Sequence, residues 1–187
     1  MIGTVRPAAA AKDDSMDQNE RNVGRANPNA PALARFAFLI GDWRGEATFT
    51  SPDGGRQRFA VTWLGRYILD GYAIADDYRM TDPSGKLVVL GTNFRTYDAV
   101  RQEWNIRWLN ALAGTWTELV PNELGGIHFD GPSVTYAFKE PAANPGAYTR
   151  ATYTNVSETH FTWRGEQSDD AKSWTDFMVV ELDRRRD

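Results

Sequence analysis

Two polar residues near the middle of the sequence have a spacing that could support acid–base chemistry. His128 and Asp130 lie two residues apart, and residues at this spacing share one face of a β-strand. The carboxylate could then orient the imidazole as a general base. The favoured interpretation is simpler, because such a pair beside a turn is more often a solvated polar face.

Asp76 is the more interesting carboxylate, since aromatic and apolar residues share its strand face. Tyr78 and Met80 follow it at two-residue spacing. Burial among such groups would favour the protonated acid, which a general acid or base needs. A salt bridge to an inward-pointing arginine is the alternative, and the favoured one. Glu118, two residues from Trp116, is a further carboxylate candidate of the same kind.

Composition excludes several other classes of chemistry. The 187 residues include two histidines and no cysteine, so a metal site is not expected, and no phosphate-binding loop or nucleophile elbow occurs. Basic residues number 21 against 25 acidic ones without any basic block, which argues against nucleic-acid binding. No apolar run is long enough to span a membrane. The absence of cysteine fits a cytoplasmic location, although a removed secretion signal would leave the same sequence.

The elements that must position these residues begin after a polar leader. Residues 1–30 have few apolar side chains and are expected to be disordered, which leaves 31–187 as a single domain. Leu33 and Phe36 have helical spacing, and Gly41 ends that pattern. One short helix is therefore predicted at the start of the domain, as a plug at one end.

Short β-prone runs separated by turns fill the rest of the chain. About ten such runs are joined by stretches rich in Gly, Pro, Asp and Asn, which is typical of consecutive hairpins. No helical pattern long enough for a parallel crossover lies between them, so the sheet should be antiparallel. Closure into an up-and-down barrel would remove the exposed edges. A β-sandwich is the second possibility.

Alternation along the cleaner strands predicts which side chains point inward. Trp104 and Trp108 share one face, and Trp163 is opposite polar neighbours on a later strand. In the last strand the pattern is mixed, with Met178 on one side and Phe177 on the other. Aromatic residues interleaved with polar ones suit either a ligand cavity or a self-satisfied core.

Three segments resemble known proteins. The opening GDWRGEATFT resembles the G-x-W-x-G start of calycin-type barrels, including lipocalin-like and nitrobindin-like groups. TYDAVRQEWNIRWLN and FTWRGEQSDDAKSW with FMVVELDR resemble the DUF1579 type of uncharacterised bacterial proteins, over residues 33–184. This resemblance implies a calycin-like β-barrel. The nitrobindin-like branch binds haem through a late-strand histidine, but neither His128 nor His160 matches that pattern, so haem is not expected. The lipocalin branch implies a small apolar ligand.

The leading functional hypothesis is therefore a barrel that binds a small apolar or aromatic molecule. The predicted walls are Trp63, Tyr78, Trp108, Trp116, Tyr153 and Trp163, with Asp76, Arg107 and Glu118 as polar anchors. The alternative is an isomerase, cyclase or lyase acting inside the barrel, with Asp76, Glu118 or His128 as acid or base. A third possibility is a packed barrel that uses its surface for a partner or a homodimer.

Overall fold

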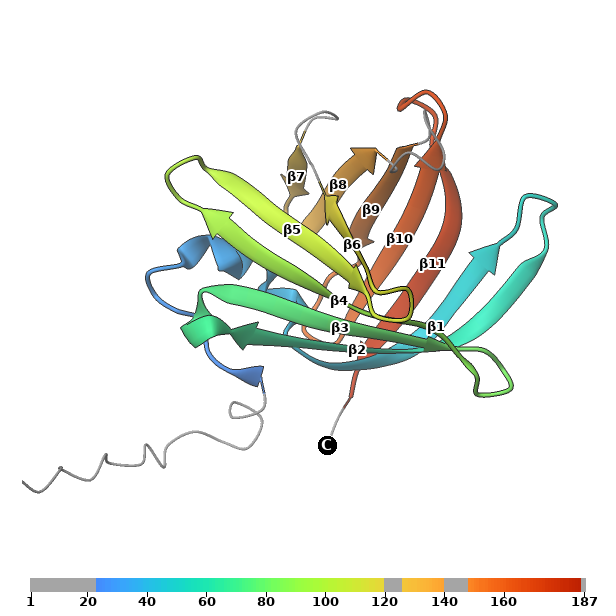
Figure 1. Cartoon of the computed structure of the whole chain (residues 1–187), viewed down its shortest axis with the longest axis horizontal. Helices are drawn as coiled ribbons and strands as arrows, with labels where there is room; N and C mark the ends of the chain where they lie inside the picture. Colours follow the sequence, from blue (N-terminus) through green and yellow to red (C-terminus); the bar gives the residue numbers. More distant parts are fainter. Residues whose placement is uncertain (1–22, 120–125, 140–147, 186–187) are drawn as a thin grey trace, which may run out of the picture.

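Eleven antiparallel β-strands form one strongly curled sheet in the computed structural model, which describes residues 23–119, 126–139 and 148–185 (Figure 1). The strands are β1 (Gly41–Thr50), β2 (Arg56–Ile68), β3 (Ala73–Thr81), β4 (Leu87–Asp98), β5 (Glu103–Asn110), β6 (Thr115–Leu119), β7 (Ile127–Asp130), β8 (Ser133–Lys139), β9 (Tyr148–Thr154), β10 (His160–Ser168) and β11 (Thr175–Arg184). Two short 3₁₀ helices, η1 (Pro31–Leu39) and η2 (Leu69–Gly71), complete the described elements. The predicted all-β antiparallel architecture with an N-terminal helix is confirmed, with eleven strands instead of about ten.

The strand order explains where the curled sheet is open. Each strand pairs with the next along the chain except at β6 and β7, and β1 pairs with β11. All of these ladders are antiparallel, which requires β6 and β7 to run in the same direction, so no hairpin can join them. Among the described residues these two strands are the sheet edges. The expected barrel closure is therefore not seen at this one position.

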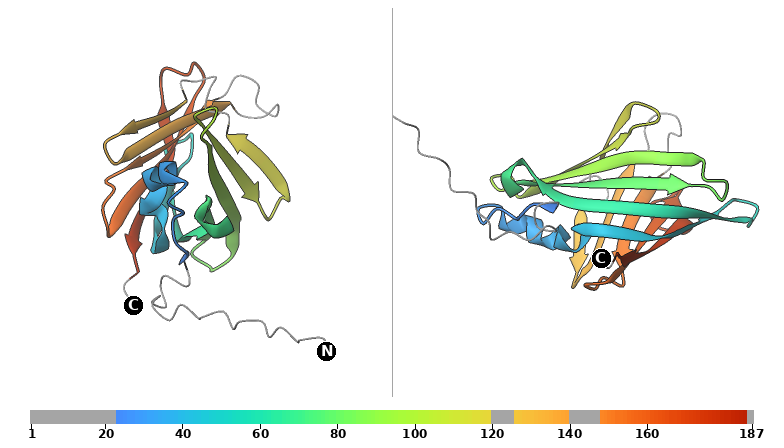
Figure 2. Two further views of the ribbon diagram at one scale, coloured as in Figure 1. Left: turned by 90° about the vertical axis from the view of Figure 1, so that its left-hand side faces the viewer. Right: turned by 90° about the horizontal axis from the view of Figure 1, so that it is seen from below.

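Helix η1 fills one end of the curl. Pro31 suits a first helical turn, and Leu33, Phe36 and Leu39 are buried. Phe36 packs edge-on against Trp104 of β5, at 4.8 Å between ring centroids, and 5.8 Å from the Phe129 ring of β7. The helix thus contacts strands on both sides of the opening between β6 and β7 (Figure 2, left).

The tryptophan of the G-x-W motif ties η1 to the first and last strands. Trp43 is fully buried, and its indole N–H donates to the carbonyl oxygen of Leu39 at 3.0 Å. The Arg184 guanidinium lies 4.1 Å above the Trp43 ring and donates to the carbonyl oxygen of Ile40. Gly41 has a φ of 129°, and a side chain there would meet Arg184. These contacts hold the plug against the sheet.

The predicted leader overlaps the described residues only at 23–30. In this stretch the backbone N–H of Asn27 donates to the Gly71 carbonyl at 3.1 Å, and its side chain donates to the Asp70 carbonyl. Residues 1–22 lie outside the described part of the chain. None of the helices described is long and apolar enough to cross a membrane.

Candidate functional site

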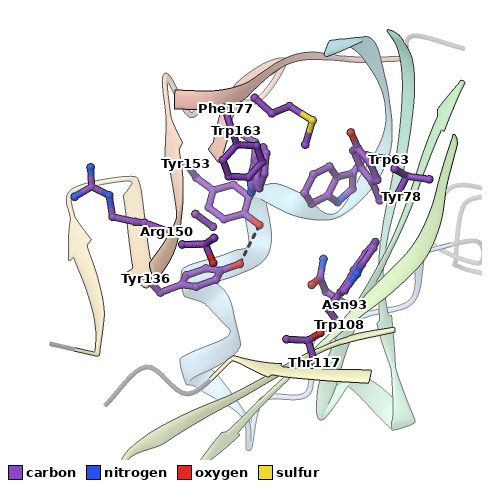
Figure 3. Close-up of a pocket in the computed structure, with 14 residues that line it drawn as sticks. Trp63, Tyr78, Asn93, Trp108, Thr117, Tyr136, Arg150, Tyr153, Trp163 and Phe177 are labelled. Carbon is purple, nitrogen blue, oxygen red and sulfur yellow. Dashed lines mark hydrogen bonds between the residues drawn. The ribbon is translucent and has the colours of Figure 1, made fainter. Parts of the chain in front are cut away.

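A pocket of about 370 Å³ lies inside the curl, between two facing walls of the sheet (Figure 3). Its lining residues are Trp63, Tyr78, Val89, Asn93, Trp108, Thr117, Tyr136, Thr149, Arg150, Ala151, Tyr153, Trp163, Phe177 and Met178. Five of the predicted wall residues are among them: Trp63, Tyr78, Trp108, Tyr153 and Trp163. Trp116 is not.

Strand register builds the first wall from β2 to β6. Trp63 is the cross-strand partner of Tyr78, and their rings meet edge to face at 5.4 Å between centroids. Asn93 is opposite Trp108, which is opposite Thr117. Directly opposite residues point to the same face of a sheet, so these five side chains reach the interior together.

The second wall comes from β8 to β11. Tyr153 of β9 is opposite Trp163 of β10, and both point inward. The Tyr136 and Tyr153 hydroxyls lie 3.3 Å apart and share a hydrogen bond (Figure 3). Two phenol groups of this wall therefore lie across the pocket from a wall that carries two indole rings, a phenol, an amide and a hydroxyl.

A β-bulge brings Phe177 into this wall. Gly165 pairs with Met178, whereas Glu166 pairs with Asp176, which leaves Phe177 as the extra residue of β11. As a result, Phe177 and Met178 both line the pocket although they are neighbours in sequence. Simple alternation predicts opposite faces for them, and the bulge is the reason why that prediction is wrong.

Two glycines leave room for the aromatic rings to lie against the backbone. A Cβ atom at Gly165 would lie 2.6 Å from Cζ of Phe177 and 2.6 Å from Cη2 of Trp163. A Cβ atom at Gly91 would collide with the ring of Trp108 and with the backbone. The absence of side chains at these positions keeps three rings close to the sheet and helps leave the interior open.

A buried polar chain connects the two walls. The Asn93 amide donates to Asp76 at 2.8 Å, and Asp76 forms an ion pair with Arg95. Arg95 in turn donates to the Tyr153 hydroxyl at 3.0 Å, and Tyr153 shares its hydrogen bond with Tyr136. Asn93, Tyr136 and Tyr153 line the pocket, while the ion pair lies behind them, where the Arg95 guanidinium also faces the η1 plug.

The ion pair decides between the two interpretations of Asp76. The side chains of Asp76 and Arg95 are both 0% exposed. Two opposite charges so placed must compensate each other, because an isolated buried charge costs several kcal/mol. The structure thus has the salt bridge to an inward arginine. Arg95 itself was not identified from sequence, because only the register between β3 and β4 shows which arginine lies near Asp76.

Two buried tyrosines of the pocket, Tyr78 and Tyr153, stay neutral over the physiological pH range. Burial raises the pKa of Tyr153 well above its ordinary value, with the neighbouring Tyr136 acting in the same direction and Arg95 against it. Burial also raises the pKa of Tyr78. Both hydroxyls therefore keep their protons and can donate hydrogen bonds.

One of the side chains that line the pocket has a buried N–H group without a partner in the described part of the chain. Trp63 is 3% exposed, and its indole N–H, which is fully buried, makes no hydrogen bond with the described residues. Buried donors are almost always paired, and an unpaired one costs roughly 1–3 kcal/mol. This N–H belongs to a lining side chain that lies beside Tyr78 (Figure 3).

Three predicted site residues lie on the outer face of the sheet. Trp116 is 58% exposed and its ring packs against Phe94, 5.9 Å between centroids. Arg107 and Glu118 form an exposed ion pair. The register pairs Arg107 with Glu118, and Trp116 with Leu109, on the face opposite Trp108. Alternation thus places all three away from the pocket, and Thr117 faces inward in their place.

Neither histidine lines the pocket. His128 is on the exposed face of β7, as is Asp130, while Phe129 between them points toward the η1 plug. His160 lies on the outer face of β10, where its ring nitrogens contact Asp183 at 2.8 Å and Glu181 at 3.2 Å. The described residues contain no group of three or more His, Asp or Glu side chains suited to holding a metal ion.

Arg150 is the one charged side chain among the described residues of the lining, and it is compensated. Its guanidinium donates to Glu166 through two nitrogens, the Nε bond being 2.8 Å long. It also lies 4.4 Å from the centroid of the Trp174 ring. Figure 3 shows this side chain extending away from the cluster of indole rings.

Comparisons with known proteins show similarity in fold. The sequence matches no protein-family model and no curated protein. Rv2717c from M. tuberculosis superposes with a TM-score of 0.57 at 12% identity, over 84% of this chain and 99% of that one. The S-type phycobiliprotein lyase CPES from Guillardia theta gives a TM-score of 0.52 at 7% identity, over 92% and 99%.

A third solved structure matches with a lower score. It is a protein of unknown function from the DUF3598 family of Nostoc punctiforme, with a TM-score of 0.47 at 12% identity over 79% of this chain. The matched region is 48% of that longer protein. At such identities the first two likenesses establish a shared curled antiparallel fold and no shared activity.

Proposed function

We propose that this protein binds a small, largely apolar or aromatic molecule inside its curled sheet. The observation that carries the proposal is the pocket of about 370 Å³ with indole and phenol walls. Ligand pockets are typically concave, about 300–1,000 Å³ in volume and mainly apolar, with a few polar groups that fix orientation. We place the chain in a calycin-type family, and in the DUF1579 type, on the sequence motifs at Trp43, Trp104 and Trp163.

A packed core without a ligand is the less favourable interpretation. The pocket has room for on the order of a dozen water molecules at their liquid volume. Its lining is dominated by large rings, which would gain free energy by burying more of their surface. A bound aromatic molecule would supply that contact.

The catalytic alternative has less support from the positions of its candidate residues. Asp76 lies behind the pocket in its ion pair, and Glu118 and His128 are on the outer face. None of these three is among the described lining residues. Binding is therefore the function that the geometry supports best.

The direct test is a fluorescence titration of the purified protein. Trp63, Trp108 and Trp163 line the pocket, so a bound aromatic compound should quench tryptophan emission in a saturable way. The panel would contain naphthalene, quinoline and other two- and three-ring compounds. It would also contain a bilin, because one protein of similar fold is named a phycobiliprotein lyase.

Two matched tryptophan variants localise the binding. Trp163→Ala removes part of the pocket wall and should weaken binding about ten-fold or more, which corresponds to roughly 1.4 kcal/mol. Trp116→Ala removes an equally large ring on the outer face and should leave the affinity unchanged. Equal losses in both variants, or no saturable quenching by any compound, would contradict the proposal.

A further inference from the structure

The side-chain amide of Asn93 presents an unpaired acceptor inside the pocket. Asn93 is half-buried and lines the pocket, and its Nδ2 donates to Asp76 at 2.8 Å. Its Oδ1 accepts no hydrogen bond from the described residues. This oxygen is also not one of their fully buried unpaired atoms, so it keeps accessible surface, in contrast to the indole nitrogen of Trp63.

The position of Asn93 in the sheet shows that this oxygen faces the ligand space. Asn93 of β4 lies directly opposite Asp76 of β3 and opposite Trp108 of β5. Directly opposite residues share one face of a sheet, and here that face is the interior of the curl. In Figure 3 the amide oxygen is turned toward the wall that carries Tyr136. The accessible surface of the oxygen is therefore pocket surface.

The buried ion pair fixes which end of the amide faces the ligand. The ion-paired carboxylate of Asp76 can only accept hydrogen bonds, so the NH2 group of Asn93 must turn toward it. A flipped amide would place its oxygen against a carboxylate oxygen. Asp76 and Arg95 are both 0% exposed, so water does not compete for this contact. The Asn93 oxygen is thus held toward the pocket as an acceptor.

An acceptor held in this way discriminates between ligands. A hydrocarbon that fills the pocket would take water away from the Asn93 oxygen and leave it without a donor, which costs the desolvation of a polar group. A ligand that brings only acceptor atoms to this place would not satisfy it either. A ligand with an O–H or N–H group would replace the hydrogen bond that water loses.

We infer that the pocket accepts an aromatic molecule that carries a hydrogen-bond donor on its ring edge, an O–H or N–H group placed against the amide oxygen of Asn93. This inference rests on the proposed binding function and specifies the ligand class. The aromatic walls provide the contact area, and the Asn93 oxygen sets the orientation of the ligand.

The compounds 2-naphthol and 2-methoxynaphthalene test the donor requirement, because both carry an oxygen at the same ring position and only 2-naphthol has an O–H. Their dissociation constants would be measured by isothermal titration calorimetry at pH 7, where 2-naphthol is uncharged. The wild type should bind 2-naphthol at least about three-fold more tightly. Asn93→Leu keeps a similar volume and removes the amide oxygen, so this preference should fall roughly three- to ten-fold.

Val89→Ala is the matched control. Val89 lies four residues before Asn93 on the same strand and the same face, lines the pocket and has no polar side-chain atom. Its truncation changes the pocket wall without changing the acceptor. Both compounds should bind this variant more weakly, with their ratio unchanged within about two-fold.

The outcomes separate the inference from the proposed function. The absence of a 2-naphthol preference in the wild type, or an unchanged preference in Asn93→Leu, would overturn the inference while binding itself stands. Failure of both compounds and of naphthalene to bind the wild type would overturn both. If Asn93→Leu does not fold, the assigned side-chain carbonyl carbon resonance of Asn93 in the wild type gives the answer. A hydrogen bond from 2-naphthol should move it downfield and 2-methoxynaphthalene should not, and equal shifts would overturn the inference.

Discussion

The Asp76–Arg95 pair is the residue-level feature on which the polar side of the pocket depends. Both side chains are fully buried, and Arg95 holds the Tyr153 hydroxyl while Asp76 holds the Asn93 amide. Each charge compensates the other, so removal of one partner leaves an unpaired charge in the interior. The pair fixes the donors and acceptors that face a ligand without exposing a charge to it.

Arg95→Met should therefore destabilise the protein far more than the same substitution in an exposed pair. We expect a loss of about 3–5 kcal/mol in the free energy of unfolding, measured by urea denaturation. Arg107→Met, which breaks the exposed pair with Glu118, should cost no more than about 1 kcal/mol. Adding Asp76→Leu to Arg95→Met should recover much of the loss. Equal costs for the two arginine variants would contradict this account.

At the scale of the elements, the β10–β11 bulge determines the shape of the second wall. It turns Phe177 inward beside Met178, and Gly165 on the facing strand makes room for the Phe177 and Trp163 rings. In Gly165→Ala the new methyl group would meet only side-chain atoms among its nearest neighbours. The rings must then move away from the sheet and into the pocket.

Gly165→Ala should therefore reduce ligand affinity more than stability. We expect naphthalene binding to weaken about ten-fold, while the free energy of unfolding falls by about 1–2 kcal/mol. Fluorescence titration and urea denaturation measure the two effects. A variant that binds naphthalene as tightly as the wild type would show that the rings have another way to relax.

The strands also show which features of the fold a sequence pattern predicts and which it does not. Alternation correctly predicts that Trp108 and Trp163 face inward, because their strands are regular and polar residues separate the aromatic ones. It cannot locate a bulge, so it wrongly predicts that Phe177 and Met178 point to opposite faces. In β6 the large ring of Trp116 suggested a wall residue, but the register with β5 gives that face to Thr117. Register depends on contacts between strands, and the alternation pattern of a single sequence does not determine those contacts.

At the scale of the whole molecule, the curled sheet and the η1 plug surround an interior. Among the described residues, the sheet is open between its two edge strands, β6 and β7. The sheet runs continuously from β6 through β1 and β11 to β7, and Phe36 of η1 packs against residues of β5 and β7. Within this interior, Asp76 is paired with Arg95, and the Tyr78 and Tyr153 hydroxyls are protonated. The stability of the whole fold is thereby linked to pH.

Burial of Tyr78 and Tyr153 predicts a loss of stability at alkaline pH. Both phenols have pKa values raised above the ordinary 10.0, mainly by burial. Above about pH 10 the unfolded chain releases these protons and the folded protein retains them, so the free energy of unfolding decreases as pH rises. Each tyrosine contributes about 1.4 kcal/mol per pH unit between its unfolded and folded pKa values.

Urea denaturation between pH 8 and pH 11.5 should therefore show a plateau followed by a decline that begins near pH 10. Burial also raises the pKa of Tyr67, so three phenols contribute to the decline. Tyr153→Phe removes one of them, so its decline should be about one-third less steep than that of the wild type. Tyr72→Phe, at a phenol that is 49% exposed, should leave the slope unchanged. A wild-type curve that stays level to pH 11.5, with tyrosinate absorbance rising in the folded protein, would mean that these phenols ionise in place. The interior would then admit charge.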